Sequence, residues 1–101
     1  MSRAGSIQPS KLPDGTLVRR ARGVVDRPMG GEHVIVHVKN RRIYRLNGTA
    51  AAIWSNADGG ATVAGIADAI VARFRVDADT ARADVEGCLT HLRDQGLLEV
   101  A

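Results

Sequence analysis

The stretch HVIVHVKNRRIYRLNGTAAAIW, residues 33–54, decides the fold because its hydrophobic pattern changes period half-way along. Residues 33–46 are rich in alternating β-branched side chains, which predicts two strands joined by a tight turn at Lys39–Arg41. From Asn47 onward the stretch is rich in alanine and ends in Ile-Trp, which predicts a helix capped by Asn47. The chain therefore passes from strands to helices at this point.

The register of the predicted hairpin follows from the length of its turn. A three-residue turn centred on Asn40 pairs Val36 with Tyr44, whereas a turn of even length mixes the valines with Arg41 and Arg45. Only the three-residue turn yields an apolar face, so we favour it. The face that it predicts consists of Val34, Val36, Val38, Tyr44 and Leu46.

The segments before this hairpin predict one more strand. Thr16–Arg20 is a short candidate strand, and the segment 23–32, which holds a proline and a Gly-Gly pair, is predicted to be a loop. Residues 1–15 are rich in Ser, Gly and Pro and are predicted to form a flexible arm. The folded domain is therefore expected to span residues 16–101.

The segments after the first helix predict two more helices. Thr62 caps the first of these and Asp77 the second, which ends at Gly96. Residues 97–100 are expected to be a short strand or an apolar flap that closes the core. Three strands followed by three helices make an α+β domain, which in a chain of this size is winged-helix-like. The last helix carries an apolar stripe made of Ala81, Val85, Cys88, Leu89 and Leu92.

The composition restricts the classes of function. The chain has 101 residues, 45% of them hydrophobic, and one cysteine, which fits one small domain without a disulfide framework. It has no apolar run long enough for a membrane span and no apolar N-terminal core like that of a signal peptide. We therefore expect a cytoplasmic protein that does not bind a membrane.

Candidate metal ligands and catalytic groups are few and poorly placed. His33 and His37 lie on one face of a strand but about 13 Å apart, too far to share an ion. Cys88 and His91 are three positions apart on a helix, and two ligands are too few for a structural zinc site. No glycine-rich phosphate loop is present, and Cys88 lies on an apolar stripe. We therefore expect no metal, no cofactor and no enzymatic activity.

Charge is divided between the two halves of the chain. Residues 1–46 hold ten Lys and Arg against three Asp and Glu, a net charge of +7, and residues 47–101 hold four against eight, a net charge of −4. A winged-helix DNA-binding protein would place its last helix in the major groove, yet residues 77–95 are acidic overall. DNA binding is therefore kept only as the alternative, and no nucleic acid is expected as a partner.

The positive charge gathers instead at the predicted strand 42–46. This strand is followed directly by a helix, so it is expected to form an edge of the sheet, where an extended peptide can add as a further strand. Arg41, Arg42 and Arg45 would favour an acidic peptide there. The same arginines could equally protect the edge against aggregation, and the pattern leaves both interpretations open.

Several motifs follow one another along the chain. They begin with YRLNGTAAAIW at residues 44–54 and DGGATV at residues 58–63. They continue with Ile66-Ala67, Phe74, ARADV at residues 81–85, Leu92 and GLL at residues 96–98. In this order they resemble the PqqD-like family, the recognition elements of ribosomally made, post-translationally modified peptides. The resemblance covers about residues 16–100.

The resemblance implies both a fold and a function. Family members have a three-stranded antiparallel sheet followed by three helices, and they are not enzymes. They bind the leader of a precursor peptide, which adds as a strand beside the third strand, in a groove walled by the third helix. They present this leader to a maturation enzyme such as a radical SAM protein, a cyclase or a leader peptidase. The same role is expected of this chain.

Carried over to this sequence, the resemblance also implies a peptide-binding site. The backbone edge would consist of Arg42, Ile43, Tyr44, Arg45 and Leu46. The groove floor would consist of Val85, Cys88, Leu89 and Leu92. One flank of the last helix holds Arg82, Glu86 and Arg93, the other holds Asp84, His91 and Gln95, and the choice between them stays open. The long 23–32 segment departs from some relatives, so the first strand is expected to be weakly held, in a monomer or a strand-exchanged dimer.

Overall fold

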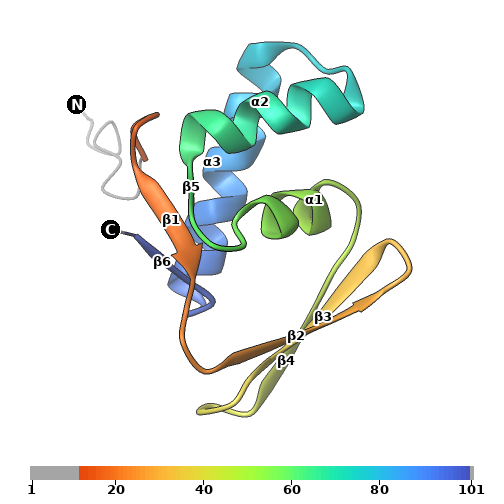
Figure 1. Ribbon diagram of the computed structural model, residues 1–101, viewed down its shortest axis with the longest axis vertical. Coiled ribbons are helices and arrows are strands. Elements are labelled where there is room, and N and C mark those ends of the chain that lie inside the picture. Colours follow the sequence, from red (N-terminus) through yellow and green to blue (C-terminus); the bar gives the residue numbers. More distant parts are fainter. Residues whose placement is uncertain (1–11, 101) are drawn as a thin grey trace, which may run out of the picture.

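The computed structural model describes residues 12–100, which form an α+β fold with two small sheets and three helices. Figure 1 shows the helices stacked on one side and the larger sheet extending below them. The strands are β1 Leu17–Arg20, β2 Val24–Met29, β3 Glu32–His37, β4 Arg42–Leu46, β5 Ala61–Thr62 and β6 Leu98–Val100. The helices are α1 Gly48–Asn56, α2 Val63–Phe74 and α3 Ala78–Asp94.

The three-stranded antiparallel sheet is present, but its first strand is not the predicted one. The sheet has the order β2-β3-β4, whereas β1 pairs with β5 and β6 in a second sheet. The predicted loop 23–32 is thus wrong, because it forms β2 and its turn. Pro28 is tolerated since β2 is an edge strand, and Gly30, at φ 65°, makes the two-residue turn to β3.

The predicted hairpin register is also wrong by one residue. His37 pairs with Arg42, so the turn has four residues, 38–41, and Ile35 pairs with Tyr44. The turn is closed by the Arg41 N–H, which donates to the His37 carbonyl at 2.8 Å, with Arg41 in the left-handed region at φ 60°. Tyr44 and Leu46 therefore share the inner face with fully buried Ile35, and not with the valines.

Both faces of this sheet carry apolar side chains, and for this reason the alternation of the sequence alone assigned some residues to the wrong face. On the outer face Val25, Val36 and Ile43 oppose one another across the three strands. Ile43 is 70% exposed, whereas Ile35 on the inner face is fully buried. The predicted apolar face of Val34, Val36, Val38, Tyr44 and Leu46 is therefore split between the two sides of the sheet.

The helix boundaries follow the predicted caps. The Thr62 hydroxyl accepts from the Gly65 N–H at 3.0 Å, and the Asp77 carboxylate accepts from the Thr80 N–H at 2.8 Å. The Asp77 carboxylate also accepts from the Thr80 hydroxyl, and the two hydrogen bonds hold the pKa of Asp77 below its ordinary value. Asn47 is the cap of α1 in extended backbone, but its side chain makes no capping bond.

Arg75 ends α2 in the left-handed conformation, at φ 56°, where glycine is the usual residue. We expect Arg75→Gly to raise the free energy of unfolding by about 0.5–1 kcal/mol, because the side chain no longer strains this cap. Urea denaturation measures the change. Arg73→Gly is the matched control: it places glycine inside the last helical turn and should lower stability by about 1 kcal/mol. A loss of stability in both variants would contradict the prediction.

Candidate functional site

The strand β4 is an edge of the larger sheet. It pairs with β3 on one side, and no strand among residues 12–100 pairs with its other side. In an antiparallel ladder alternate residues bond to the neighbour, so the remaining N–H and C=O groups of β4 point away from β3, toward the side that no strand in this part of the chain covers. The five predicted edge residues, 42–46, are the five residues of this strand. They offer main-chain hydrogen bonds to an added strand.

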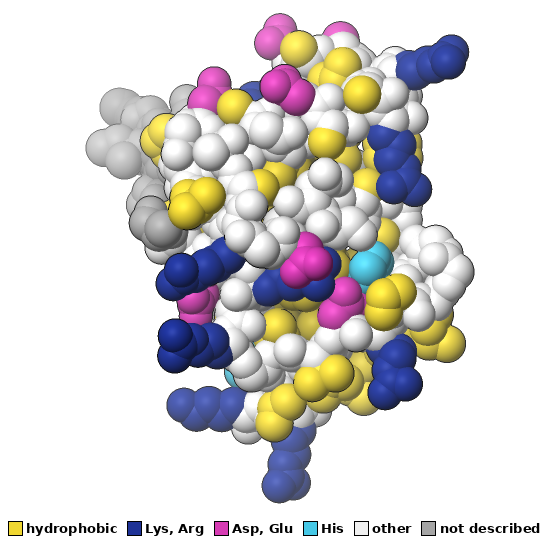
Figure 2. Space-filling view, in the orientation of Figure 1, with side chains coloured by type: hydrophobic (Ala, Val, Ile, Leu, Met, Phe, Trp, Pro, Cys, Tyr) yellow, Lys and Arg dark blue, Asp and Glu magenta, His cyan; other side chains and the backbone are white. Residues whose placement is uncertain are grey.

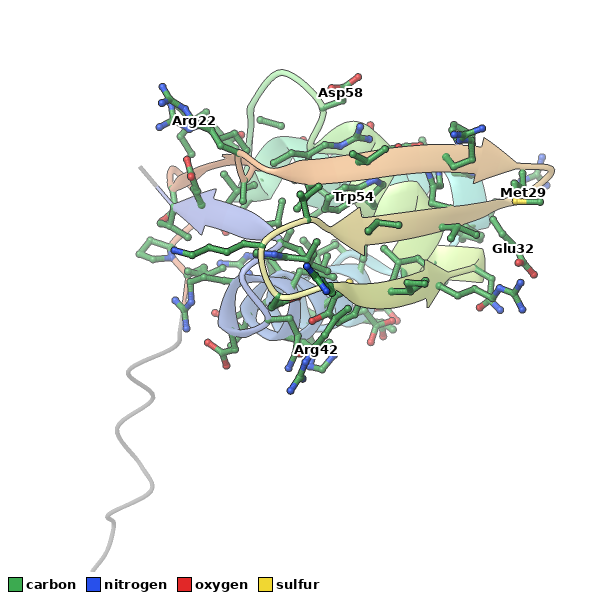
Figure 3. All side chains as sticks on the ribbon, turned by 90° about the horizontal axis from the view of Figure 1, so that it is seen from below. Arg22, Met29, Glu32, Arg42, Trp54 and Asp58 are labelled. Atoms are coloured by element: carbon green, nitrogen blue, oxygen red, sulfur yellow. The ribbon has the colours of Figure 1, made fainter. Side chains whose placement is uncertain are left out.

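The helix α3 ends beside this sheet. The Tyr44 hydroxyl on β4 donates to the Gln95 side-chain oxygen, at 3.3 Å, just after the end of α3. Gly96 lies against the His37 ring, where an added Cβ would come within 3.3 Å of the imidazole nitrogen. Seen from below, β4 is on the side of the sheet where α3 lies (Figure 3). The two elements named by the sequence for the peptide site are therefore neighbours.

The contact with Tyr44 identifies which flank of α3 is turned toward β4. At 3.6 residues a turn, Cys88 and Gln95 lie within about 20° of each other around the helix, whereas Glu86 and Gln95 are about 180° apart. The flank near β4 is therefore the one that carries Asp84, Cys88, His91 and Gln95. Sequence reasoning left this choice open because it depends on a tertiary contact.

The opposite flank of α3 holds the chain's own N-terminal segment. The Glu86 carboxylate accepts from the Leu12 N–H at 2.9 Å, and Arg82 donates to the Leu12 carbonyl and to Asp14. Leu12 itself is 3% exposed and belongs to the core. Arg82 and Glu86, both predicted to contact the peptide, are thus placed away from β4. The other residues of the predicted arm, 1–11, lie outside the described residues.

The predicted groove floor is mostly core. Val85 and Leu89 are fully buried and Leu92 is 2% exposed, so these three pack inside the domain. Cys88 is half-buried and is packed against the same core from its edge. Of the four predicted floor residues, Cys88 therefore reaches the surface most directly.

Burial raises the pKa of the Cys88 thiol from its ordinary 9.0 to about 11. We therefore expect iodoacetamide at pH 8 to modify the folded protein about a hundredfold more slowly than the urea-unfolded chain, since the thiolate is the nucleophile. Because the folded pKa is raised, the thiol's contribution to stability is complete below pH 9 and is lost as the pH rises toward 11. Equal alkylation rates in the two states would contradict this assignment.

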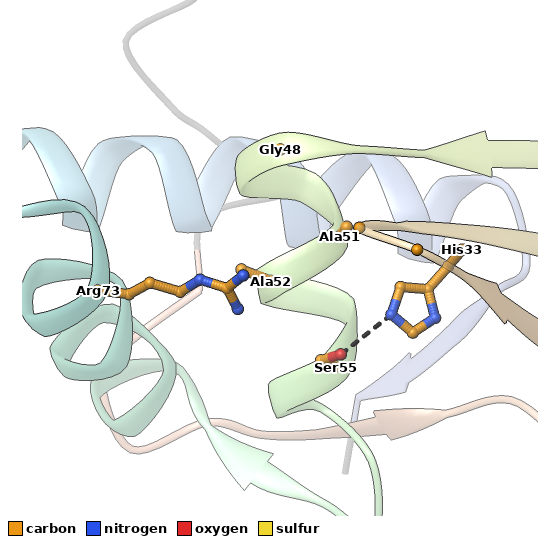
Figure 4. Close-up of a pocket in the computed structure, with 8 residues that line it drawn as sticks. His33, Gly48, Ala51, Ala52, Ser55 and Arg73 are labelled. Atoms are coloured by element: carbon orange, nitrogen blue, oxygen red, sulfur yellow. Dashed lines mark hydrogen bonds between the residues drawn. The ribbon is translucent and has the colours of Figure 1, made fainter.

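A hydrogen-bonded network that the sequence did not reveal joins the sheet to α1. The His33 Nδ1 lies 2.8 Å from the Asp26 carboxylate, and its Nε2 lies 3.1 Å from the Ser55 hydroxyl beside a small cavity (Figure 4). Arg20 completes the network by pairing with Asp26 at 3.2 Å while its guanidinium stacks on Trp54. The network was missed because a loop over residues 23–32 gives no strand pairing, and it is the pairing of β2 with β3 that brings Asp26 close to His33.

The hydrogen-bonded groups Ser55, His33 and Asp26 follow the Ser–His–Asp order of a hydrolase triad, but the surroundings of these groups differ from those of a triad. Ser55 lies inside α1, where the flanking backbone N–H groups bond within the helix and cannot stabilise an oxyanion. Asp26 is shared with Arg20 and therefore is not held for His33 alone. We interpret the network as a structural tie between β1, the sheet and α1.

Within residues 12–100 no group of three or more His, Cys, Asp or Glu side chains is arranged to hold a metal ion. None of the helices in this part of the chain is both long and apolar enough to cross a membrane.

Comparison with known proteins gives the geometry its context. The family model of coenzyme PQQ synthesis protein D, PqqD, matches residues 32–98. TbiB1, solved in complex with the TbiA(beta) leader peptide, is 27% identical with a TM-score of 0.74, over 80% of this chain and 94% of that chain. Among curated proteins, none matches the sequence.

Two further solved structures share the fold. The PqqD truncation of Methylobacterium extorquens PqqCD, described as a functional, stand-alone recognition element for ribosomally synthesised and post-translationally modified peptides, is 26% identical with a TM-score of 0.72, over 92% of this chain and 99% of that chain. Lasso peptide synthetase B1 with its leader peptide is 19% identical with a TM-score of 0.68, over 81% and 96%. Since the family model spans well over half of the sequence, this chain belongs to the PqqD family.

Proposed function

We propose that this chain binds the leader segment of a ribosomally made precursor peptide, which adds as a strand to β4. The observation that carries the proposal is the unpaired edge of β4 beside α3, with the two elements joined by the bond from Tyr44 to Gln95. The structure of TbiB1 with a leader peptide, on the same fold, supports it. Cys88 and His91 on the facing flank of α3 would contact side chains of the leader.

The edge is long enough for a useful affinity. A peptide along the five residues of β4 can form about five main-chain hydrogen bonds, each contributing a net 0.5–1.5 kcal/mol. Contacts with Tyr44 and α3 add side-chain burial. Together these terms correspond to a micromolar dissociation constant.

The proposed role is presentation and not catalysis. The chain would hold the leader while a separate maturation enzyme, such as a radical SAM protein, a cyclase or a leader peptidase, acts on the rest of the precursor. We place this step in the cytoplasm, where ribosomes make the precursor. The alternative role in DNA binding is disfavoured, because the exposed acids Asp79, Asp84 and Asp94 lie along α3 and would face the phosphates.

Backbone N-methylation of the leader tests the proposal. Sequencing of the DNA beside the gene of this chain is used to search for a short precursor reading frame, and the probe is the synthetic leader found there, methylated at one backbone nitrogen at a time. In an added strand every second N–H points to β4, so alternate positions should lose affinity at least tenfold and the others little. Isothermal titration calorimetry gives the values. Uniform small losses, or losses at consecutive positions, would contradict strand addition.

A further inference from the structure

Three cations gather where β4 begins. Lys39 and Arg41 lie in the β3–β4 turn and Arg42 is the first residue of β4; all three are exposed. In the part of the chain that the structure describes, none of the three has an ion pair. Arg45, further along the strand, is turned to the outer face and is already bonded to Glu32 at 3.3 Å. The uncompensated charge of this edge is therefore at its turn end.

The turn that carries these cations is held in a defined shape. The Arg42 N–H donates to the Asn40 side-chain oxygen at 3.0 Å, and the Asn40 N–H donates to the His37 ring at 3.4 Å. The Val38 N–H donates to the Gly23 carbonyl at 2.9 Å, which fastens the turn to the neighbouring β1–β2 connection. The cations are thus attached to a fixed backbone beside the open edge, and not to a free loop.

The backbone conformation of Arg41 is an independent observation. Its φ of 60° lies in the left-handed region, which costs a non-glycine residue about 1–2 kcal/mol and is usually given to Gly or Asn. Strain of this kind is often found where the side chain has a function. The left-handed position is occupied here by an exposed arginine next to the proposed peptide edge.

We propose that the leader bound by this chain carries acidic side chains at the end of its bound segment that lies beside the β3–β4 turn, where Lys39, Arg41 and Arg42 recognise them. The proposal rests on leader binding at β4 and adds to it the chemical class and the position of the recognised residues. Figure 2 shows Lys and Arg side chains projecting from the lower edge of the molecule, where Figure 1 places this turn. A peptide with acidic residues only at its other end would gain nothing from this cluster.

Selection from a display library of random peptides tests the proposal without knowledge of the natural leader. Peptides are selected on the folded full chain, and those that slow amide exchange in β4 are kept. We expect these peptides to share acidic residues at one end of the bound segment. The double variant Arg41→Glu/Arg42→Glu should bind them at least tenfold more weakly, and peptides with Lys at the acidic positions should regain affinity for that variant.

Arg22→Glu/Arg27→Glu is the matched control. Both arginines are exposed and have no ion pair among residues 12–100, so the net charge changes equally. In Figure 3 Arg22 lies toward the β2 edge of the sheet and Arg42 toward the β4 edge, and Arg27 is on β2 itself, the far edge from β4. The control should bind the selected peptides within about threefold of the unmodified chain. Thermal melting confirms that both double variants are folded.

The possible outcomes distinguish a failure of this charge-recognition proposal from a failure of the leader-binding proposal on which it rests. Peptides that protect β4 but lack acidic residues, or that bind the Arg41/Arg42 variant as well as the unmodified chain, overturn the charge assignment and leave leader binding intact. If none of the selected peptides slows amide exchange in β4, both strand addition and this proposal are overturned. Binding of a DNA duplex that the Arg41/Arg42 variant loses and the control retains would assign the cluster to nucleic acid and overturn the proposal.

Discussion

Replacement of Val85 by Asp is expected to unfold the protein. Val85 is fully buried on α3, in the core that also contains Trp54 and Ile35. A carboxylate there has no partner and no water, and its burial costs about 5 kcal/mol or more, which is comparable with the whole stability of a domain of this size. Circular dichroism should show loss of helix, and leader binding should disappear with it.

The control for this variant is Val38→Asp. Val38 is 57% exposed in the β3–β4 turn, so its replacement should change the free energy of unfolding by less than about 0.5 kcal/mol. A folded Val85→Asp protein with the melting temperature of the unmodified chain would show that α3 is not packed on the core as described.

Asp26→Ala is expected to cause the next largest loss. Asp26 joins Arg20 and His33, and the side chains of all three are at most 20% exposed. Its removal leaves the Arg20 guanidinium with the exposed Asp58 and the Trp54 carbonyl as partners, at a cost of about 2–4 kcal/mol. The melting temperature should fall by about 10 °C or more.

Glu99→Ala is the matched control for that network. It also removes the carboxylate of an arginine pair, Arg19–Glu99 at 3.1 Å, but the two side chains are 59% and 41% exposed. Solvent screens such a pair, so the expected loss is below about 0.5 kcal/mol. Equal losses in Asp26→Ala and Glu99→Ala would show that the buried network contributes no more than a surface ion pair.

The helical half of the fold was predictable from the sequence because its signals are local. Thr62 and Asp77 cap α2 and α3 by bonds to residues three positions on, and such bonds follow from residue type and spacing. The apolar stripe of α3 follows in the same way: Val85, Leu89 and Leu92 are buried as predicted. The predicted apolar segment after Gly96 is the strand β6.

The strand half was less predictable because its determinants are not local. A proline and a Gly-Gly pair signalled a loop at 23–32, yet both are compatible with an edge strand and a two-residue turn. Apolar residues on both faces of β3 removed the alternation that fixes register. The four-residue turn also requires Arg41 to adopt the left-handed backbone conformation, which cannot be predicted from an arginine at this position.

The candidate site also has one part that local sequence signals predict and another part that depends on tertiary contacts. The edge 42–46 was predicted because the chain leaves the sheet for a helix directly after this strand, and the sheet order β2-β3-β4 confirms it. The facing flank of α3 was not, because it is decided by the bond between Tyr44 and Gln95, 51 positions apart. The placement of Arg82 and Glu86 was also out of reach, since both are held by Leu12, a residue assigned to the flexible arm.

Amide hydrogen–deuterium exchange of residues 42–46, with and without the leader peptide, tests strand addition at β4 most directly. The free edge of β4 exposes the amides that do not pair with β3, so these should exchange rapidly alone and slow at least tenfold when the leader is saturating. Exchange in β2, the other edge of the same sheet, should stay unchanged. A leader that binds with full affinity while the β4 amides exchange at their free rates would contradict strand addition at this edge.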